Sequence, residues 1–204
     1  MTVHSHRPVR IEYEVLRMRV IAGSARRLAL KTIEGMETRP TTDRIKETLF
    51  NMLNPRLYDC QFLDLFSGSG AIGIEALSRG AARAVFVEKH PKAVQVIKDN
   101  LAFTRLADKA IVMPMDVKEA LRRLEEQKAH FDLIFMDPPY HQGLEREVLE
   151  ILQDSCLIDG DSLIVVEASR ETDFSYLESL GMELLRQKEY KTNQHVFVRR
   201  LAQS

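Results

Sequence analysis

The feature that most constrains the fold of this chain is a regular alternation of strand-like and helix-like segments that begins at Gln61. Short apolar runs are each followed by a longer segment in which apolar residues recur at helical spacing. The pattern predicts strands at 61–65, 84–88, 110–114, 131–136 and 162–167, and helices at 70–79, 91–104, 117–127, 144–153 and 174–179. Strands that alternate with helices form a parallel sheet with right-handed crossovers, so the predicted class is α/β.

Both ends of the chain depart from this alternation. Met182 to Tyr190 and Gln194 to Arg200, separated by a short polar turn, predict an antiparallel hairpin at the C-terminus. Met18 to Ala22 and Arg27 to Thr32 predict a second, smaller hairpin near the N-terminus. The two hairpins therefore flank the α/β pattern.

One further helix is predicted between the N-terminal hairpin and the first strand of the sheet. Pro40-Thr41-Thr42-Asp43 supplies residues that commonly begin a helix. Apolar residues then recur at helical spacing until Asn54-Pro55, where the helix is predicted to end.

The chain divides into three predicted regions. Residues 1–17 lack periodicity and are expected to be a disordered leader, either native or added for expression. Residues 18–55 hold the small hairpin and the helix, and residues 56–204 hold the α/β body. A chain of 204 residues with 45% hydrophobic content can bury one sizeable core.

Composition argues against a membrane protein and a disulfide scaffold. No stretch approaches the ~20 apolar residues needed to cross a bilayer, and no secretory leader opens the chain. Cys60 and Cys156 fit neither a metal-binding spacing nor a disulfide framework, so two thiols in a reducing compartment are expected. We therefore expect a cytoplasmic protein without a metal site.

Positive charge is concentrated near the N-terminus. The formal net charge is −1, yet residues 17–46 hold eight basic and three acidic residues. A basic segment on a nearly neutral body is typical of a face that meets phosphates, although such a run is also common on a merely solvated surface. The candidate nucleic-acid-binding residues in this segment are Arg19, Arg26, Arg27, Arg39 and Arg44.

Asp137-Pro138-Pro139-Tyr140, which follows the apolar run 131–136, indicates the chemistry. The aspartate and the Pro138 carbonyl can accept hydrogen bonds from a flat amino group while the tyrosine ring stacks on the base that carries it. The two prolines restrict the backbone and hold these acceptors in place. The simpler alternative is a strand followed by a proline turn.

Candidate cofactor-binding residues fall at the carboxyl ends of the predicted strands, where α/β sheets bind ligands. Gly68-Ser69-Gly70 leaves the first strand and enters a helix, so its amides can approach a ligand closely. Glu88 ends the second strand and can bind a ribose, and Asp116 follows the third and can accept from an adenine amino group, although each could also be a helix cap or a surface acid. The full set is Asp64, Phe66, Ser67, Gly68, Ser69, Gly70, Glu88, Lys89, Asp116 and Val117.

Two cofactors are compatible with this glycine loop. Residues 68–73 also match the G-x-G-x-x-G pattern of dinucleotide-binding sites. Asp64 argues against a dinucleotide, because its charge would repel a pyrophosphate but stabilise an α-amino group. Hydride transfer also has no need of the Asp-Pro-Pro-Tyr motif. S-adenosylmethionine is therefore the predicted cofactor.

Taken together, five motifs resemble the bacterial small-subunit ribosomal RNA guanine-N2 methyltransferase family, type D. The motifs are Arg39-Pro40-Thr41-Thr42-Asp43-Arg44, Glu47-Thr48-Leu49-Phe50-Asn51, Asp64-Leu65-Phe66-Ser67-Gly68-Ser69-Gly70, Glu75-Ala76-Leu77-Ser78-Arg79-Gly80 and Asp137-Pro138-Pro139-Tyr140. The resemblance extends from about Met18 to Arg200. It departs at Ala25-Arg26-Arg27, where many members carry Gly-Arg, so the RNA contacts of the hairpin remain open.

The resemblance implies a Rossmann-like class I methyltransferase fold with a seven-stranded, mostly parallel sheet. It also implies that residues 18–55 dock RNA and cover the cofactor, with Thr41 near the cofactor. The implied substrate is a guanine of 16S ribosomal RNA, in the small subunit or a late precursor of it. A monomer is expected.

The expected reaction is direct methyl transfer. A guanine amino nitrogen is a poor nucleophile, so Asp137 and the Pro138 carbonyl are expected to stabilise it while Tyr140 stacks on the flipped base. Pro139 completes the catalytic motif. Two alternatives stay open: adenine-N6 methylation of DNA or another RNA, and an RNA-binding assembly factor that has lost turnover.

Overall fold

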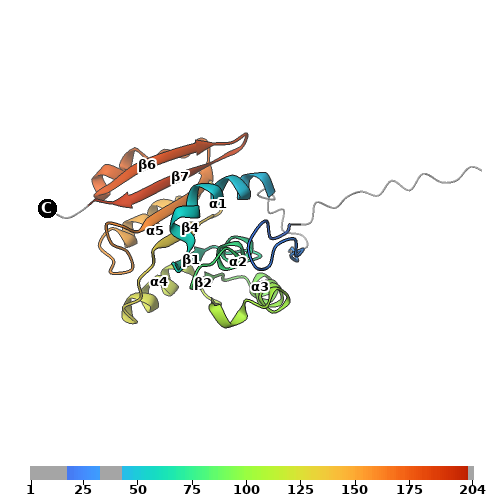
Figure 1. The fold of residues 1–204 in the computed structure, drawn as a ribbon. Helices are drawn as coiled ribbons and strands as arrows, with labels where there is room; N and C mark the ends of the chain where they lie inside the picture. The colour runs from blue at the N-terminus through green and yellow to red at the C-terminus, as the bar shows by residue number, and fades with distance from the viewer. Residues whose placement is uncertain (1–17, 33–42, 202–204) are drawn as a thin grey trace, which may run out of the picture.

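A seven-stranded sheet forms the centre of the computed structural model, which describes residues 18–32 and 43–201 (Figure 1). Its strands are β1 (Gln61–Leu65), β2 (Arg83–Val87), β3 (Ala110–Met113), β4 (Leu133–Met136), β5 (Leu163–Ser169), β6 (Met182–Glu189) and β7 (Asn193–Arg200). They lie in the order β3-β2-β1-β4-β5-β7-β6. The first five are parallel, and β7 runs antiparallel to both β5 and β6. The predicted α/β class, the seven-stranded sheet and the C-terminal hairpin are confirmed.

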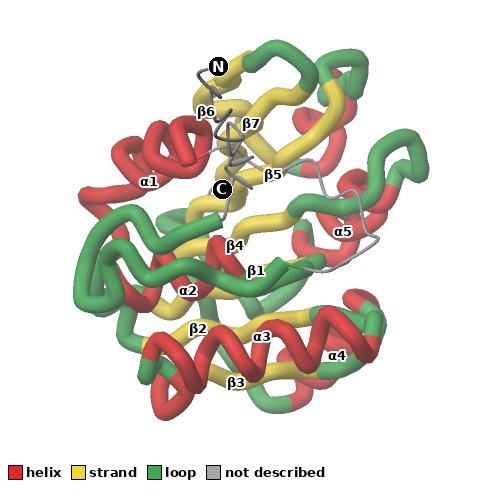
Figure 2. The backbone as a smooth tube through the Cα atoms, turned by 90° about the vertical axis from the view of Figure 1, so that its right-hand side faces the viewer, coloured by secondary structure: helices red, strands yellow, loops and turns green. Residues whose placement is uncertain are grey.

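Helices cover both faces of the sheet. They are α1 (Asp43–Leu57), α2 (Ala71–Ser78), α3 (Pro91–Thr104), α4 (Val117–Glu126) and α5 (Leu144–Leu152), with short 3₁₀ turns at Ala107–Lys109 and Ser175–Leu180. Figure 2 shows α1 and α2 on one side of the strands and α4 and α5 on the other. Buried side chains of α1, α2 and α3 pack on one face, and those of α4 and α5 pack on the opposite face.

Strands β1, β2, β4 and β5 are mostly apolar because both of their faces are buried. In β1, Phe62 packs toward α1 and α2, whereas Leu63 and Leu65 pack toward α4 and α5. Asp64 is the exception, since it is 1% exposed in the middle of this apolar pattern. A buried carboxyl group needs a hydrogen-bonding partner, which makes Asp64 a residue of interest before any site is considered.

The N-terminal hairpin is less regular than predicted. In place of two strands, an isolated antiparallel bridge joins Arg19 to Ala29. The segment is held mainly by α2, because Ser78 accepts a hydrogen bond from Ser24 N–H at 2.8 Å and its hydroxyl donates to the Ala22 carbonyl at 2.6 Å. Only glycine fits at position 23, since a Cβ there would lie 1.8 Å from the Ser78 carbonyl oxygen.

A buried ionic cluster also fastens this segment to the body. The Glu75 carboxylate accepts from Ile21 N–H at 2.7 Å and from Ala22 N–H at 3.0 Å. The Lys46 ammonium of α1 lies 3.6 Å from Glu75 and donates to the Arg19 carbonyl at 2.5 Å. Both side chains are at most 1% exposed. Arg79 also pairs with Glu75, at 2.7 Å, so residues 18–32, α1 and α2 are joined through one interior cluster of charges.

Two predicted helices differ from the structure. The first continues through Pro55 to Leu57, because Leu57 is buried in the core and its packing offsets the backbone hydrogen bond that proline removes. The last predicted helix, 174–179, is a 3₁₀ turn at Ser175–Leu180. Strand β5 runs two residues beyond its predicted end, to Ser169. Glu167 therefore lies inside a strand.

Some predictions fall outside the described residues. The leader at 1–17, Arg39 and Thr41 belong to these segments. Among the helices of the described part of the chain, none is both long enough and apolar enough to span a bilayer.

Candidate active site

A cavity of about 1180 Å³ opens at the carboxyl ends of the parallel strands. Its wall combines the loop after β1, the ends of β2 and β5, the start of α4 and the segment after β4. The predicted site residues that line it are Phe66, Ser67, Gly68, Ser69, Glu88, Lys89, Asp116, Val117, Asp137, Pro138, Pro139 and Tyr140. Asp64 and Gly70 lie behind this wall rather than in it. One cavity thus brings the glycine loop and the Asp-Pro-Pro-Tyr motif together.

The glycine loop is held by short hydrogen bonds to the strands around it. The Ser67 hydroxyl donates to the Asp64 carbonyl at 2.7 Å, and Gly70 N–H donates to the Ser67 carbonyl at 2.7 Å. Gly70, at φ 77°, needs a left-handed backbone to enter α2. Phe66 also has a positive φ, of 60°, which is costly for a residue with a side chain. This strain lies in the cavity wall, where Phe66 borders the ligand space.

Glu88 is fixed beside that loop. One oxygen of its carboxylate accepts from Gly68 N–H at 2.9 Å and the other accepts from His90 N–H at 2.8 Å. Each carboxylate oxygen can accept a second hydrogen bond. The half-buried carboxylate is therefore oriented, and it keeps lone pairs for a ligand that carries hydroxyl groups.

Asp64 lies behind the cavity wall and supports the start of α2. Its Oδ2 atom accepts from Gly73 N–H at 2.9 Å, near the start of α2. Burial raises the pKa of Asp64 to about 7, the Gly73 N–H acts in the opposite direction, and the nearby Glu88 charge raises the pKa further. One oxygen of the carboxyl group thus supports α2, and the expected contact of Asp64 with an α-amino group stays a prediction.

Asp116 is the N-cap of α4, as one of the two sequence interpretations predicted. Its side chain accepts from Lys118 N–H at 3.0 Å, and Lys89 lies 3.8 Å from its other oxygen. The same residue lines the cavity beside Val117. Asp116 can both cap the helix and contact a ligand, because the cap position places its carboxylate at the N-terminus of α4.

The Asp-Pro-Pro-Tyr segment follows β4 directly. Asp137 N–H donates to the Leu65 carbonyl at 3.4 Å, which aligns the segment with the end of β1. Burial raises the pKa of the Asp137 carboxyl well above its usual range, and the nearby charges of Glu167 and Asp64 raise it further. Tyr140 is half-buried, and its ring packs edge-on against the His141 ring, with 6.4 Å between the ring centroids. The segment offers a carboxyl group, a carbonyl and an aromatic ring to one space.

Sequence reasoning missed two buried charged side chains in the wall. Lys46 reaches the cavity from α1, and burial lowers its pKa although Glu75 and Asp43 act to raise it. Glu167 reaches the cavity from β5. The apolar pattern predicted the strand β5 itself. Nothing in the local sequence distinguishes Glu167 from any other acidic residue at the end of a strand.

A family model described as conserved hypothetical protein 95 matches residues 18–199. The chain belongs to this family. The putative rRNA methyltransferase YlbH of Bacillus subtilis is 40% identical over 172 residues, which cover 84% of this chain and 92% of that protein. The ribosomal RNA small subunit methyltransferase D of Escherichia coli is 38% identical over 154 residues, 76% of each chain. The resemblance to the type D family is therefore confirmed.

A solved structure of this family has the same fold. A putative methyltransferase, yhhF, from Escherichia coli superposes with a TM-score of 0.79 at 37% identity, and the match covers 92% of this chain and 99% of that one. The Rossmann-like methyltransferase fold expected from the motifs is confirmed.

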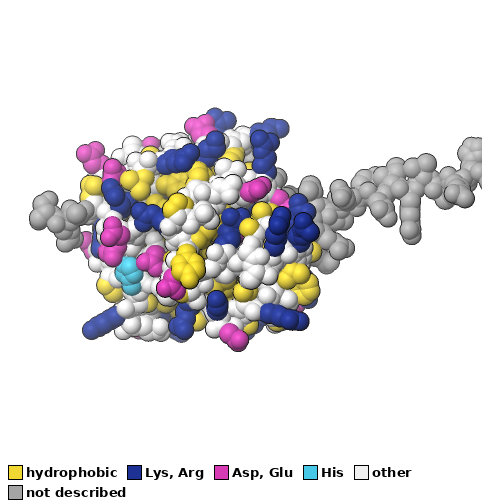
Figure 3. Space-filling view, viewed as in Figure 1, with side chains coloured by type: hydrophobic (Ala, Val, Ile, Leu, Met, Phe, Trp, Pro, Cys, Tyr) yellow, Lys and Arg dark blue, Asp and Glu magenta, His cyan; other side chains and the backbone are white. Residues whose placement is uncertain are grey.

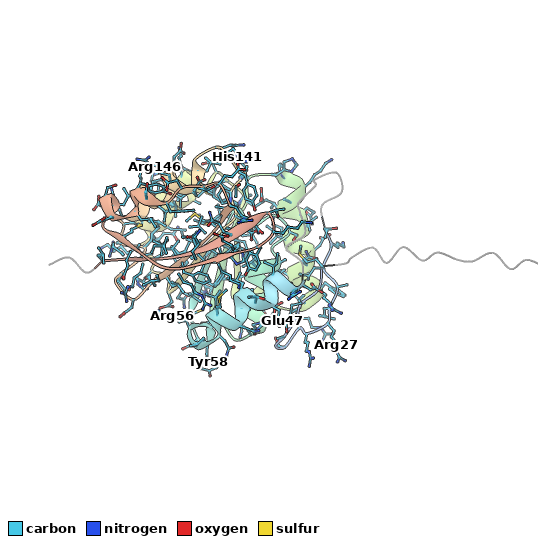
Figure 4. All side chains as sticks on the ribbon, turned by 90° about the horizontal axis from the view of Figure 1, so that it is seen from above. Arg27, Glu47, Arg56, Tyr58, His141 and Arg146 are labelled. Atoms are coloured by element: carbon cyan, nitrogen blue, oxygen red, sulfur yellow. The ribbon has the colours of Figure 1, made fainter. Side chains whose placement is uncertain are left out.

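Four of the predicted RNA-binding arginines belong to the described residues, and none of the four lines the cavity. Arg19, Arg26, Arg27 and Arg44 are all exposed. Arg19 pairs with Asp43 at 2.7 Å, which joins the hairpin to the start of α1 on the surface. Figure 4 shows Arg27 pointing away from the body of the molecule. Basic side chains are visible on the side of Figure 3 where the hairpin and the start of α1 lie.

Proposed function

We propose that this protein transfers a methyl group from S-adenosylmethionine to the exocyclic N2 of a guanine in small-subunit ribosomal RNA. The observation that carries the proposal is the joint placement of the glycine loop and Asp137 in one cavity. The names of the relatives support ribosomal RNA as the substrate class. The choice of guanine N2 rests on the family resemblance of the motifs.

The cofactor occupies the half of the cavity formed by β1, β2 and α4. Gly68 and Ser69 border its amino-acid portion, Glu88 binds the ribose hydroxyls, and the adenine lies near Asp116 and Val117. In this arrangement Asp64 acts from behind by holding the start of α2 through Gly73 N–H, 2.9 Å away. Thr41 keeps its proposed role near the cofactor, from a segment outside the described residues.

The substitution Glu88→Ala is expected to weaken S-adenosylmethionine binding about tenfold to a hundredfold, because two charge-assisted hydrogen bonds to the ribose are lost. Calorimetry on the wild type and the variant measures the effect. Glu183→Gln, which changes a surface carboxylate on β6, serves as the control. Unchanged affinity would remove Glu88 from the cofactor site, and tight NADH binding by the wild type would favour the dinucleotide alternative.

The target base enters the other half of the cavity. Asp137 and the Pro138 carbonyl accept the two amino N–H groups and orient the nitrogen toward the sulfonium methyl, while Tyr140 stacks on the base. The nitrogen's electron pair forms the new N–C bond as the C–S bond breaks and leaves its pair on sulfur. The nitrogen becomes acidic only after it takes the methyl group, so its proton then passes to Asp137 or to water. Neither cysteine lines the cavity, which agrees with direct transfer.

The RNA docks through the basic N-terminal segment. Arg26 and Arg27 are exposed at the tip of the hairpin, and Arg44 is exposed near the start of α1. The hairpin is anchored by α2, whose N-terminus follows the glycine loop. Phosphates that bind these arginines would therefore have a fixed position relative to the cofactor. Arg39 belongs to the same proposed surface, outside the described residues.

Reversing the charge of Arg26 and Arg27 to glutamate is expected to raise the apparent KM for ribosomal substrate steeply and to flatten its salt dependence, because phosphate contacts set both quantities. Cofactor affinity is expected to stay unchanged, since neither side chain lines the cavity. The measurement is the initial rate against substrate concentration at several salt levels. Curves identical to those of the wild type would reduce the hairpin to a solvated surface.

The choice of macromolecule is tested by one transfer experiment. Labelled S-adenosylmethionine is incubated with the protein and, in parallel, naked 16S ribosomal RNA, small subunits from cells that lack the enzyme, and duplex DNA. We expect label in the subunits or the RNA. Label in DNA would favour the adenine-N6 alternative, and cofactor binding without transfer to any substrate would favour a silent assembly factor. We also propose a cytoplasmic, monomeric enzyme.

A further inference from the structure

Glu167 is a second carboxylate in the reaction half of the cavity, and the mechanism above does not use it. It is 4% exposed, yet it lines the cavity together with Asp137. A buried carboxylate that faces a ligand space is costly unless it is hydrogen-bonded, so its partners indicate what it does there.

The sheet register places Glu167 beside Asp137. Met136 on β4 pairs with Val166 on β5, so the next residues of these two parallel strands, Asp137 and Glu167, are neighbours across the sheet. Adjacent strands lie about 4.8 Å apart, and residues in register point to the same face. Glu167 in turn pairs with His195 on β7. A row of three polar residues thus crosses the end of the sheet.

The two carboxyl groups differ in their hydrogen bonds. Glu167 Oε1 accepts from the Asn193 amide at 2.5 Å, and its Oε2 lies 3.0 Å from His195 Nε2, which we take as the donor. The other ring nitrogen of His195 lies 3.4 Å from the Tyr190 hydroxyl, which fits this tautomer. Among the described residues, none donates a hydrogen bond to the side chain of Asp137. Two donors therefore hold the Glu167 carboxylate in place, whereas Asp137 has no such support.

The other titratable groups around the pair act in both directions. Asp64 pairs with Phe135 of β4 and so lies on the same face of the sheet as Asp137, where it adds negative charge. Lys46 lines the cavity from α1 and is paired with Glu75. Glu167 itself raises the pKa of Asp137, after the larger effect of burial. Two like charges this close cannot both remain ionised cheaply, so one member binds a proton first.

We propose that Glu167 is a positioning residue for methyl transfer, held beside Asp137 by Asn193 and His195, and that its negative charge makes Asp137 take up a proton more readily on acidification. The inference rests on the proposed function, in which ionised Asp137 accepts the amino N–H of the base. Methyl transfer is then lost at low pH through protonation of Asp137, and Glu167 decides at which pH this occurs.

The test is the pH dependence of single-turnover methyl transfer at saturating cofactor and RNA. In Glu167→Gln the repulsion is gone, so we expect the acid midpoint to move to lower pH by about one unit. His195→Phe keeps an aromatic ring against Phe135, 6.2 Å away, but removes the donor to Glu167. We expect a smaller shift in the same direction, because the Glu167 carboxylate is then held less firmly beside Asp137. Glu183→Gln is expected to leave the midpoint unchanged.

A second readout is independent of the RNA. Carbon-13 labelling of aspartate carboxyl groups allows the titration of Asp137 to be followed by NMR, with Asp137→Asn to assign its signal. We expect Asp137 to titrate at lower pH in Glu167→Gln than in the wild type. The same midpoint in both proteins would overturn the inference. A shifted titration in a protein that methylates no RNA would instead overturn the proposed function and leave the charge coupling established.

Discussion

The substitution Asp137→Ala is expected to lower the rate of methyl transfer about 30-fold to 1,000-fold, while S-adenosylmethionine affinity changes by no more than several-fold. The loss corresponds to about 2–4 kcal/mol of transition-state stabilisation, the usual cost of removing a preorganised group at a reaction centre. Cofactor affinity survives because Asp137 follows β4, whereas the proposed cofactor contacts come from the loop after β1, the end of β2 and the start of α4.

Single-turnover rates and calorimetry on the same protein separate the two effects. Asp137→Asn is the informative companion, since an amide keeps one acceptor and is expected to retain more activity than alanine. Asp154→Ala, at an exposed position just after α5, is the matched control and is expected to behave as the wild type. Near-normal turnover in Asp137→Ala would refute the role assigned to this residue.

The substitution Glu75→Ala is expected to lower the free energy of unfolding by about 3–5 kcal/mol, because it leaves the Lys46 ammonium uncompensated in the interior. Lys46 and Glu75 are at most 1% exposed and lie 3.6 Å apart. The same change removes the acceptor of the Ile21 and Ala22 N–H groups, so the N-terminal hairpin is expected to lose protection from hydrogen exchange before the sheet does.

Denaturant unfolding gives the stability, and amide exchange locates the loss. Glu119→Ala on α4 removes a carboxylate that pairs with Arg122 and Arg123 on the surface, and it is expected to have a far smaller effect because solvent screens exposed pairs. Equal stability of Glu75→Ala and the wild type would mean that the hairpin is held by its backbone contacts with Ser78 rather than by the buried charge pair.

The sheet was predictable because each strand carries its own signal. Both faces of β1, β2, β4 and β5 are buried, so these strands are nearly continuous apolar runs. The cavity followed from the same argument, since the carboxyl ends of parallel strands meet at one edge. The motifs at those ends predict that Glu88, Asp116 and Asp137 share one wall, and all three line the cavity.

The features that were predicted wrongly or not at all have a common cause. They depend on contacts between residues distant in sequence. In the local sequence, Pro55 predicts the end of a helix. Burial of Leu57 in the core instead extends α1 past it. The two hairpin strands were predicted from local patterning, whereas α2 holds the segment with only a single bridge. Glu167 lies beside Asp137 because of the register between β4 and β5. It lies beside its partner His195 because β7 returns antiparallel to β5.

The role of Asp64 shows the same limit in the site itself. The sequence places a carboxylate just ahead of a glycine loop, which suggested a ligand for an α-amino group. In the fold, Asp64 instead holds the start of α2 through Gly73, where an added Cβ would lie 2.3 Å from the Phe86 ring. Close packing of helix against sheet therefore accounts for Gly73 and for this contact of Asp64, while the contact of Asp64 with an α-amino group stays a prediction.

The measurement that tests the central claim most directly is the identity of the methylated nucleoside. Small subunits from cells lacking the enzyme are treated with the wild-type protein and S-adenosylmethionine, and their 16S ribosomal RNA is digested to nucleosides for mass spectrometry, with Asp137→Ala treated in parallel. The account predicts N2-methylguanosine at a single site with the wild type and almost none with the variant. N6-methyladenosine, or equal methylation by both proteins, would contradict it.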